Sequence, residues 1–186
     1  MSDQLIATHA SATLANLKSG SLFSSPIQKG ENVYETFRTL NKRFKKKGLR
    51  IIPLKITNKN VLVYLYRPEK LQEELNDKDI KKFLSNYGYN CNDEIKAVSH
   101  LATRVKNNLE FPHEIGLFLG YPLEDVNGFI QNKQESKMIG YWRVYGDVEK
   151  AKQRFDMYKK CTDIFTTNLK RNITLEEMTI ETGGSL

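Results

Sequence analysis

The chain has 186 residues, 39% of them hydrophobic, which is enough to bury the core of one globular domain spanning residues 1–186. Its two cysteines, Cys91 and Cys161, form no Cys-x-x-Cys pair, so we expect neither a disulfide framework nor a metal site. No apolar run is long enough to span a membrane, and residues 1–14 lack the basic and apolar regions of a signal peptide. We therefore expect a cytoplasmic protein with no membrane partner.

The formal net charge of +7 comes almost entirely from residues 33–50, where seven basic residues face one acid, Glu35. The basic residues are Arg38, Lys42, Arg43, Lys45, Lys46, Lys47 and Arg50. Such a patch can attract a nucleic acid or another phosphate-bearing partner. It can equally be a solvated helix end, because cations are favourable near the C-terminus of a helix.

The N-terminal third of the chain predicts two helices and a β-hairpin. Residues 1–32 are rich in small and hydroxyl residues and predict a short helix followed by a loop. From Val33 to Lys47 apolar residues recur every three or four positions, which predicts an amphipathic helix that Gly48 ends. Two β-branched and aromatic runs within residues 49–67 predict an antiparallel hairpin. Pro53 lacks an amide proton and should lie on an edge strand or at a strand irregularity.

Three helices are predicted to follow the hairpin. One begins at Pro68, and the second is capped by Asp77 and stops at Gly88. Asn92 or Asp93 caps the third, which runs to Leu109.

The remainder predicts strands alternating with helices. Residues 114–120 form an apolar run typical of a short buried strand, and a helix begins at Pro122 with two acids in its first turn. Residues 138–145 predict the last strand, after which Asp147 caps a long helix to about Leu169. A capping-box pattern at residues 174–177 predicts a final helical turn, and residues 181–186 predict a flexible tail.

This order of elements predicts an α+β fold. We expect a small mixed or antiparallel sheet of about four strands, built from the hairpin 49–67 and the strands 114–120 and 138–145, with helices covering it. The chain has no GxGxxG, Walker, GxSxG or HExxH motif, so no cofactor is expected and the common hydrolase signatures fail.

His113 is the candidate catalytic residue. It stands at the entrance of the predicted strand, where a partly exposed imidazole can act as a general base. Alternatively, it hydrogen-bonds a backbone carbonyl and caps the strand. Glu114 cannot orient it directly, because adjacent side chains of a strand point to opposite faces.

Aromatic residues are concentrated in residues 138–145. Strand alternation places Tyr141, Arg143 and Tyr145 on one face and Trp142 and Val144 on the other, which suits either core packing or the wall of an aromatic pocket. Cys161 has the spacing of a helix face packed on the core, as a structural cysteine would, whereas Cys91 stands in a loop and is expected to be exposed.

The runs "FPHEIGLFLGYPLEDVNGFI" and "GYWRVYGDVEKAKQRFDMYKKCT" resemble an uncharacterised bacterial family, common in clostridia, of domain of unknown function 3793. The resemblance extends to "TLANLKSGSLFS" and "GLRIIPLKI", so it covers nearly the whole chain. It implies no established activity, substrate or cofactor.

The chain departs from that family in its N-terminal motif, which in the family runs His-Cys-(Ser/Ala)-Pro-Thr-Leu. This chain has His9-Ala10-Ser11-Ala12-Thr13-Leu14, so an alanine replaces the cysteine. A cysteine at the start of a helix, paired with His113, would resemble the Cys–His order of papain-like enzymes. Under this hypothesis the family is a thiol-dependent hydrolase or acyl transferase, and this chain is inactive.

Two other functions compete with the thiol enzyme. We favour a cytoplasmic binding module for a small molecule or a protein, with a pocket near His113, Glu114, Tyr121 and Tyr141 and with the segment from His9 through Ala10 to Thr13 as one wall. Nucleic-acid binding through the basic helix ranks third.

Overall fold

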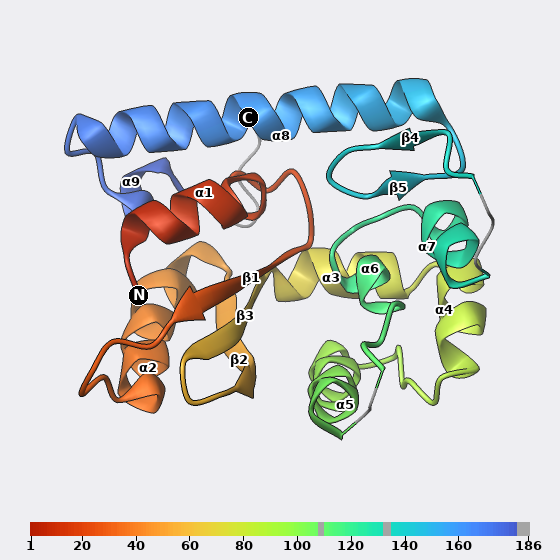
Figure 1. Cartoon of the computed structure of the whole chain (residues 1–186), viewed down its shortest axis with the longest axis horizontal. Helices are drawn as coiled ribbons and strands as arrows, with labels where there is room; N and C mark the ends of the chain where they lie inside the picture. The colour runs from red at the N-terminus through yellow and green to blue at the C-terminus, as the bar shows by residue number, and fades with distance from the viewer. Residues whose placement is uncertain (108–109, 132–134, 182–186) are drawn as a thin grey trace.

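Helices surround a three-stranded antiparallel sheet in the computed structural model of the chain (Figure 1). The structure describes residues 1–107, 110–131 and 135–181, and its fold is α+β. The strands are β1 (Gly20–Pro26), β2 (Arg50–Ile56), β3 (Asn60–Tyr66), β4 (Met138–Ile139) and β5 (Arg143–Val144). The helices are α1 (Asp3–Leu14), α2 (Val33–Phe44), η1 (Lys45–Lys47), α3 (Pro68–Leu75), α4 (Lys78–Ser85), α5 (Glu94–Asn107), α6 (Ile115–Phe118), α7 (Leu123–Ile130), α8 (Val148–Lys170) and α9 (Leu175–Met178).

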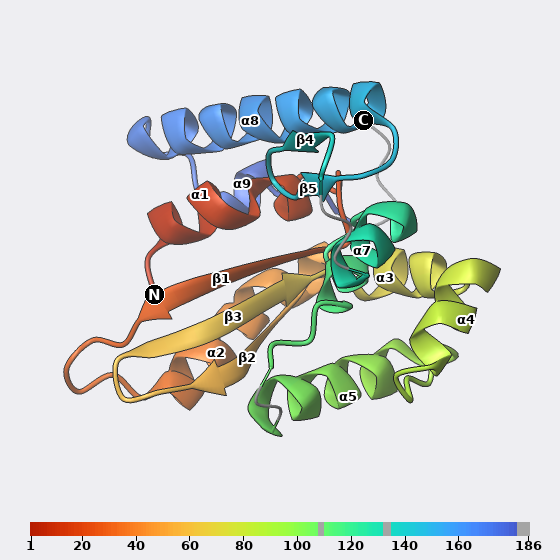
Figure 2. The ribbon, with the colours of Figure 1, turned by 45° about the vertical axis from the view of Figure 1, so that its right-hand side comes forward.

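Both faces of the main sheet are buried. Its strand order is β1-β3-β2, so β3 is central, and alternate β3 residues contribute to two different core clusters. Val61, Val63 and Leu65 pack with residues of α1 and α2. Tyr64 and Tyr66 pack with residues of α3, α5 and α6. Figure 2 shows the sheet between α1 and α5. A central strand covered on both faces requires the nearly continuous apolar sequence that β3 has.

The third strand of this sheet, β1, lies where the sequence predicted a loop. It pairs antiparallel with β3 along its whole length, from Gly20 opposite Tyr66 to Pro26 opposite Asn60. The serine-rich composition was misleading because Ser21 and Ser25 are buried in the strand, and the Ser21 hydroxyl bonds that of Thr13 at 2.8 Å. Gly20 is required here, since a Cβ at that position would lie 2.5 Å from the Phe118 carbonyl oxygen.

The hairpin prediction for residues 49–67 is confirmed by β2 and β3. The register shifts between Pro53 and Lys55, and β2 is an edge strand, so Pro53 lies at an irregularity on an edge.

The predicted strand 114–120 is wrong: these residues form the short helix α6. All four helical residues are buried, and a short run buried on every side has no periodicity that separates helix from strand. The helix ends in a Schellman arrangement, in which the Tyr121 amide donates to the Gly116 carbonyl and the Gly120 amide to that of Leu117. Gly120 has φ +72°, the left-handed conformation that this arrangement needs.

Residues 138–145 form a separate two-stranded sheet rather than one strand of the main sheet. β4 and β5 pair around a turn in which the Gly140 amide donates to the Trp142 carbonyl. The predicted alternation nevertheless holds, because Trp142 and Val144 are buried whereas Tyr141 and Arg143 are exposed.

The predicted helix starts are confirmed by their caps. The carboxylates of Asp77, Asp93 and Asp147 accept bonds from first-turn amides of α4, α5 and α8, and Thr174 forms a capping box with Glu177. The predicted end of the third helix at Leu109 lies outside the described residues, as do residues 182–186 of the predicted tail. None of the helices in the described part of the chain has the length and apolar composition to cross a membrane.

Arg67, at the junction of β3 and α3, is the largest fully buried side chain of the described residues. Its guanidinium donates to the carbonyls of Thr13 and Leu14, each at 2.7 Å. Both residues are at the C-terminal end of α1. It also donates to the carbonyls of Ile180 at 2.7 Å and Lys47 at 3.2 Å. One side chain therefore joins α1, η1 and the segment after α9 to the sheet.

Replacing Arg67 by methionine should destabilise the fold by at least about 3 kcal/mol, because several buried carbonyls would lose their donor. Urea unfolding measures this change. The matched control is Arg38→Met, whose side chain is 70% exposed and should change stability by less than about 0.5 kcal/mol. Equal effects of the two substitutions would contradict the role given to Arg67.

Candidate functional site

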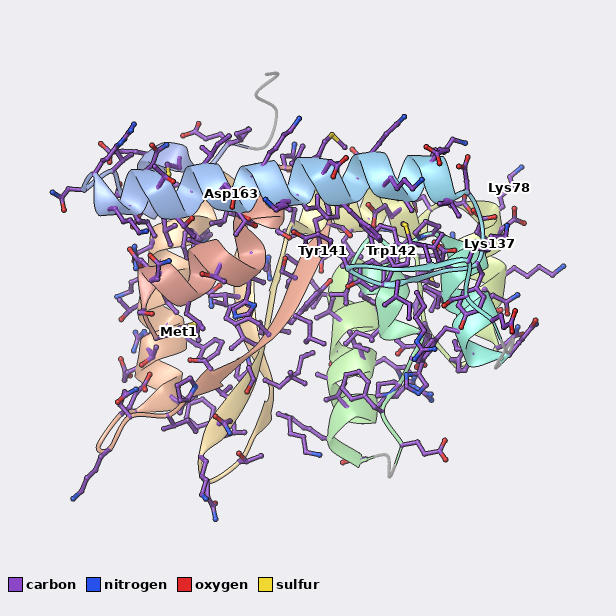
Figure 3. All side chains as sticks on the ribbon, turned by 45° about the horizontal axis from the view of Figure 1, so that its top comes forward. Met1, Lys78, Lys137, Tyr141, Trp142 and Asp163 are labelled. Carbon is purple, nitrogen blue, oxygen red and sulfur yellow. The ribbon has the colours of Figure 1, made fainter. Side chains whose placement is uncertain are left out.

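His113, Tyr121 and Tyr141, three of the predicted site residues, line one cavity of about 290 Å³. The other lining residues are Ile115, Gly116, Leu119, Asp125, Val126, Phe129, Trp142 and Arg143. We call it the aromatic cavity because four rings, those of Tyr121, Phe129, Tyr141 and Trp142, form its walls. It lies between α6, α7 and the β4–β5 hairpin, and Figure 3 shows Tyr141 and Trp142 beneath α8.

Asp125 fixes the back wall of the aromatic cavity. Its side chain is 3% exposed and accepts the Trp142 indole N–H at 2.6 Å. Its other oxygen accepts the backbone amides of Tyr145 at 2.6 Å and Gly146 at 2.8 Å. One carboxylate in the first turn of α7 therefore holds the turn and the end of the β4–β5 hairpin. From the sequence we predicted only that this acid interacts favourably with the helix dipole. Its hydrogen bonds to the β4–β5 hairpin were not predicted.

Trp142 is held on both sides by other rings. Tyr121 stacks on it with ring centroids 4.7 Å apart, and Phe155 of α8 meets it edge-on at 4.5 Å. Burial raises the pKa of Tyr121 to about 12, so its hydroxyl stays neutral. These contacts keep the cavity open in a defined shape, since neither ring can turn without displacing the other.

The mouth of the aromatic cavity is unusually apolar for an exposed surface. Phe129 and Tyr141 are each more than a third exposed, and His113 lies edge-on to Phe129 at a centroid distance of 4.9 Å. Outside the lining, the exposed Phe111 ring lies 6.3 Å from that of His113. Exposed aromatic residues that gather in one place typically mark a binding surface.

Arg143 adds charge to this mouth. Its side chain is exposed, lines the cavity, and makes no hydrogen bond or ion pair with any described residue. His113 likewise has only ring contacts within the described part of the chain. Two basic groups are thus open to a ligand, whereas the one acid of the cavity, Asp125, is fully engaged.

Glu114 does not face the aromatic cavity, although it was predicted near the site. It is buried and accepts hydrogen bonds from Arg104 Nε at 2.6 Å and from the Tyr89 hydroxyl at 3.0 Å. Burial and the adjacent carboxylate raise the pKa of Tyr89. Glu114 therefore anchors the segment before α6 to α5 and does not orient His113.

The predicted N-terminal wall lies elsewhere. The His9 ring stacks on Phe23 of β1, with centroids 5.5 Å apart, and Thr13 bonds Ser21. Ala10 is fully buried in the core between α1, α2 and the sheet. None of these three residues is in the described lining of the aromatic cavity.

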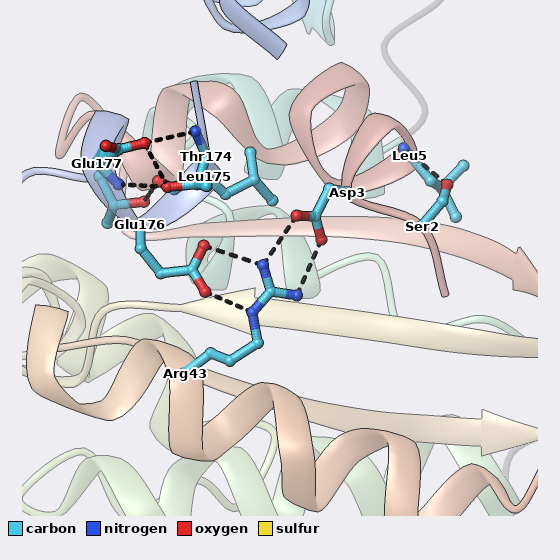
Figure 4. Close-up of polar contacts among 9 residues, drawn as sticks. Ser2, Asp3, Leu5, Arg43, Thr174, Leu175, Glu176 and Glu177 are labelled. Atoms are coloured by element: carbon cyan, nitrogen blue, oxygen red, sulfur yellow. Dashed lines mark hydrogen bonds and ion pairs between the residues drawn. The ribbon is translucent and has the colours of Figure 1, made fainter. Parts of the chain in front are cut away.

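The basic segment is partly neutralised within the fold. Arg43 forms paired hydrogen bonds with Asp3 and with Glu176, as Figure 4 shows, and these bonds lower the pKa of Glu176. Lys47 pairs with Glu181 at 2.8 Å, and Arg38 pairs with Glu35 at 3.8 Å. Lys42, Lys46 and Arg50 are exposed. Arg43 thus ties α2 to α1 and α9 rather than facing a nucleic acid.

Comparison with known protein families matches residues 6–179 to a family described as "Protein of unknown function (DUF3793)". The chain belongs to this family. The DUF3793 match runs from α1 to the end of α9 and agrees with the resemblance inferred from the sequence. Searches of curated proteins and of solved structures give no match. The DUF3793 description carries no activity, so function has to be inferred from the site.

The Cys–His hypothesis for DUF3793 finds no geometric support here. A cysteine at position 10 would be surrounded by the apolar residues that enclose Ala10, whereas His113 lies at the mouth of the aromatic cavity beside α7. Cys161 is buried, as predicted, and burial raises the pKa of its thiol to about 11, which makes it unreactive. Cys91, predicted to be exposed, is instead buried in the core near α3 and α5.

Substituting Asp125 by asparagine should loosen the aromatic cavity, because an amide cannot accept from the indole and both backbone amides as the carboxylate does. We expect a loss of about 2 kcal/mol in unfolding free energy and a shift of tryptophan emission to longer wavelength. Urea unfolding followed by fluorescence measures both, since Trp142 is the only tryptophan. Asp156→Asn, at an exposed position of α8, is the matched control and should change neither.

Proposed function

We propose that this DUF3793 protein is a binding module for a compact aromatic anion, and that the aromatic cavity is its binding site. The observation that carries the proposal is the combination of four rings around one open volume with an exposed arginine that has no partner among the described residues. Ligand sites are typically concave and apolar with a few polar groups that fix orientation.

The dimensions favour a ligand of about one ring. The cavity volume of about 290 Å³ is at the lower end of the usual range for ligand pockets, roughly 300–1,000 Å³. A flat ring fits between stacked and edge-on aromatic walls, where such contacts contribute about 0.5–1.5 kcal/mol beyond burial. The Asp125 bonds hold Trp142 in place before binding, which lowers the entropic cost of association.

The charges favour an anionic head group. Arg143 and His113 are both exposed at the mouth, and a guanidinium binds a carboxylate through two parallel hydrogen bonds. Asp125 would disfavour an anion at the back wall, so the ring should enter first and the anionic group should stay at the mouth.

A binding role fits this lining better than catalysis. The described lining contains no cysteine, serine, threonine or lysine, so His113 has no nucleophile to activate there. We also propose a cytoplasmic location, supported by the two thiols, which remain free.

A titration with benzoate and with benzyl alcohol, its neutral analogue, tests the proposal. The indole N–H of Trp142 gives a single peak in a nitrogen–proton correlation spectrum, because the chain has no other tryptophan. Both compounds should shift this peak, and benzoate should bind about tenfold more tightly, because the interaction with Arg143 is worth about 1.4 kcal/mol.

Two substitutions separate the ring contacts from the charge. Arg143→Ala should reduce the affinity for benzoate to that for benzyl alcohol. Arg38→Ala, at an exposed position of α2, should leave the affinity for benzoate unchanged. Absence of any shift with either compound would refute the cavity as a binding site. Tighter binding of benzyltrimethylammonium than of benzoate would mean that the rings select a cation instead.

A further inference from the structure

Lys18 lies in the loop between α1 and β1 and is only 8% exposed. Its amine sits over the rings of Tyr121 and Tyr158, 5.4 and 5.6 Å from their centroids. It makes no hydrogen bond or ion pair with any residue that the structure describes. Lysines are rarely buried without a partner, so this amine requires an explanation.

Two buried oxygens near Lys18 also lack partners. The Oγ of Ser19 and the Oε2 of Glu74 make no hydrogen bond of good geometry within the described residues, although the Ser19 hydroxyl lies close enough to the Glu74 carboxylate to oppose the rise in its pKa. A Cβ at Gly120 would lie 3.2 Å from Ser19 Oγ and 3.5 Å from Glu74 Oε1, so both side chains point to the same place. Natural proteins seldom leave two buried oxygens unpaired next to a lysine whose amine contacts only aromatic rings, unless something else engages them.

Burial in this cluster increases the fraction of the Lys18 amine that is neutral and therefore nucleophilic. Burial lowers the pKa of Lys18 to about 8, an effect that the charge of Glu74 partly offsets. Burial raises the pKa of Glu74, and Ser19, Lys70, Arg154 and Lys18 oppose that rise. The groups recorded around Lys18 are thus Glu74 from α3, Tyr121 after α6 and Tyr158 from α8, whereas the charges of Lys70 and Arg154 act on Glu74. At pH 7 about a tenth of such an amine is neutral, roughly two hundredfold more than for an ordinary lysine.

We propose that Lys18 is a nucleophile that forms an imine with a small aldehyde or ketone, and that Glu74 transfers the protons of this reaction. The site is separate from the aromatic cavity, although Tyr121 borders both. A neutral lysine in an apolar setting, beside a carboxyl group that can exchange protons, is the arrangement that imine formation requires.

The steps balance without an oxidant or reductant. The neutral Lys18 amine attacks the carbonyl carbon, a C–N bond forms, and the carbonyl oxygen takes a proton from the Glu74 carboxyl group. The nitrogen of this adduct then returns a proton to the Glu74 carboxylate. Glu74 next protonates the hydroxyl group, which leaves as water while the nitrogen lone pair forms the nitrogen–carbon double bond. The nitrogen then gives its remaining proton back to the Glu74 carboxylate. The products are an imine and one water molecule.

Reductive alkylation of the intact chain tests the proposal. The protein is treated briefly with acetaldehyde and cyanoborohydride at about pH 7, and modified lysines are identified by peptide mass spectrometry. We expect Lys18 to react about tenfold faster than exposed Lys42 and Lys152, because the gain in neutral amine outweighs its lower intrinsic nucleophilicity. At about pH 10 the advantage should disappear, since ordinary lysines are then largely neutral as well.

Matched carboxylates test the role of Glu74. Glu74→Gln should slow modification of Lys18 about tenfold and leave Lys42 unaffected, whereas Glu73→Gln, at the exposed neighbouring position, should change neither. If the Glu74 variant does not fold, the proposal is still tested by the ratio of the Lys18 and Lys42 modification rates in the unaltered protein. Modification of Lys18 no faster than of Lys42 at about pH 7 would overturn it.

Discussion

The buried guanidinium of Arg67 is the contact on which the arrangement of the other elements depends. Its hydrogen bonds to Thr13 and Leu14 place a cation at the C-terminal end of α1, where the helix dipole favours positive charge. Burial lowers its pKa to about 10, so the side chain remains charged at neutral pH. Because the Arg67 amide also donates to the Ser19 carbonyl, the same residue fixes the loop that carries Lys18.

A second buried charge plays the equivalent part in the other half of the molecule. Asp125 joins α7 to the β4–β5 hairpin, and Phe155 and Tyr158 of α8 pack against Trp142 of that hairpin. Tyr121 connects the two regions, since it stacks on Trp142 and lies under the Lys18 amine. Lys18, Tyr121 and Trp142 thus meet from three separate segments of the chain, and no short motif could contain them.

Local signals in the sequence were sufficient for much of the fold. The caps of α4, α5, α8 and α9, the hairpin, and the irregularity at Pro53 follow from the chemistry of a few adjacent residues. β1 and α6 were missed because tertiary burial determines them. The serines of β1 are buried in the sheet, where the Ser21 hydroxyl bonds that of Thr13, and α6 is buried on every side. The Gly120-Tyr121-Pro122 sequence did contain a helix-end signal that favours α6. The cavity residues His113, Tyr121 and Tyr141 were predicted, whereas Asp125 and Lys18 were not, since their roles depend on partners distant in sequence.

We propose that the aromatic cavity binds a ring whose anionic group stays at the mouth. Crystals soaked in para-bromobenzoate test this most directly, because anomalous scattering locates the bromine. We expect a bromine peak between the rings of Tyr121, Phe129 and Trp142, with the carboxylate next to Arg143. A fully occupied bromine elsewhere, with the cavity empty, would contradict it.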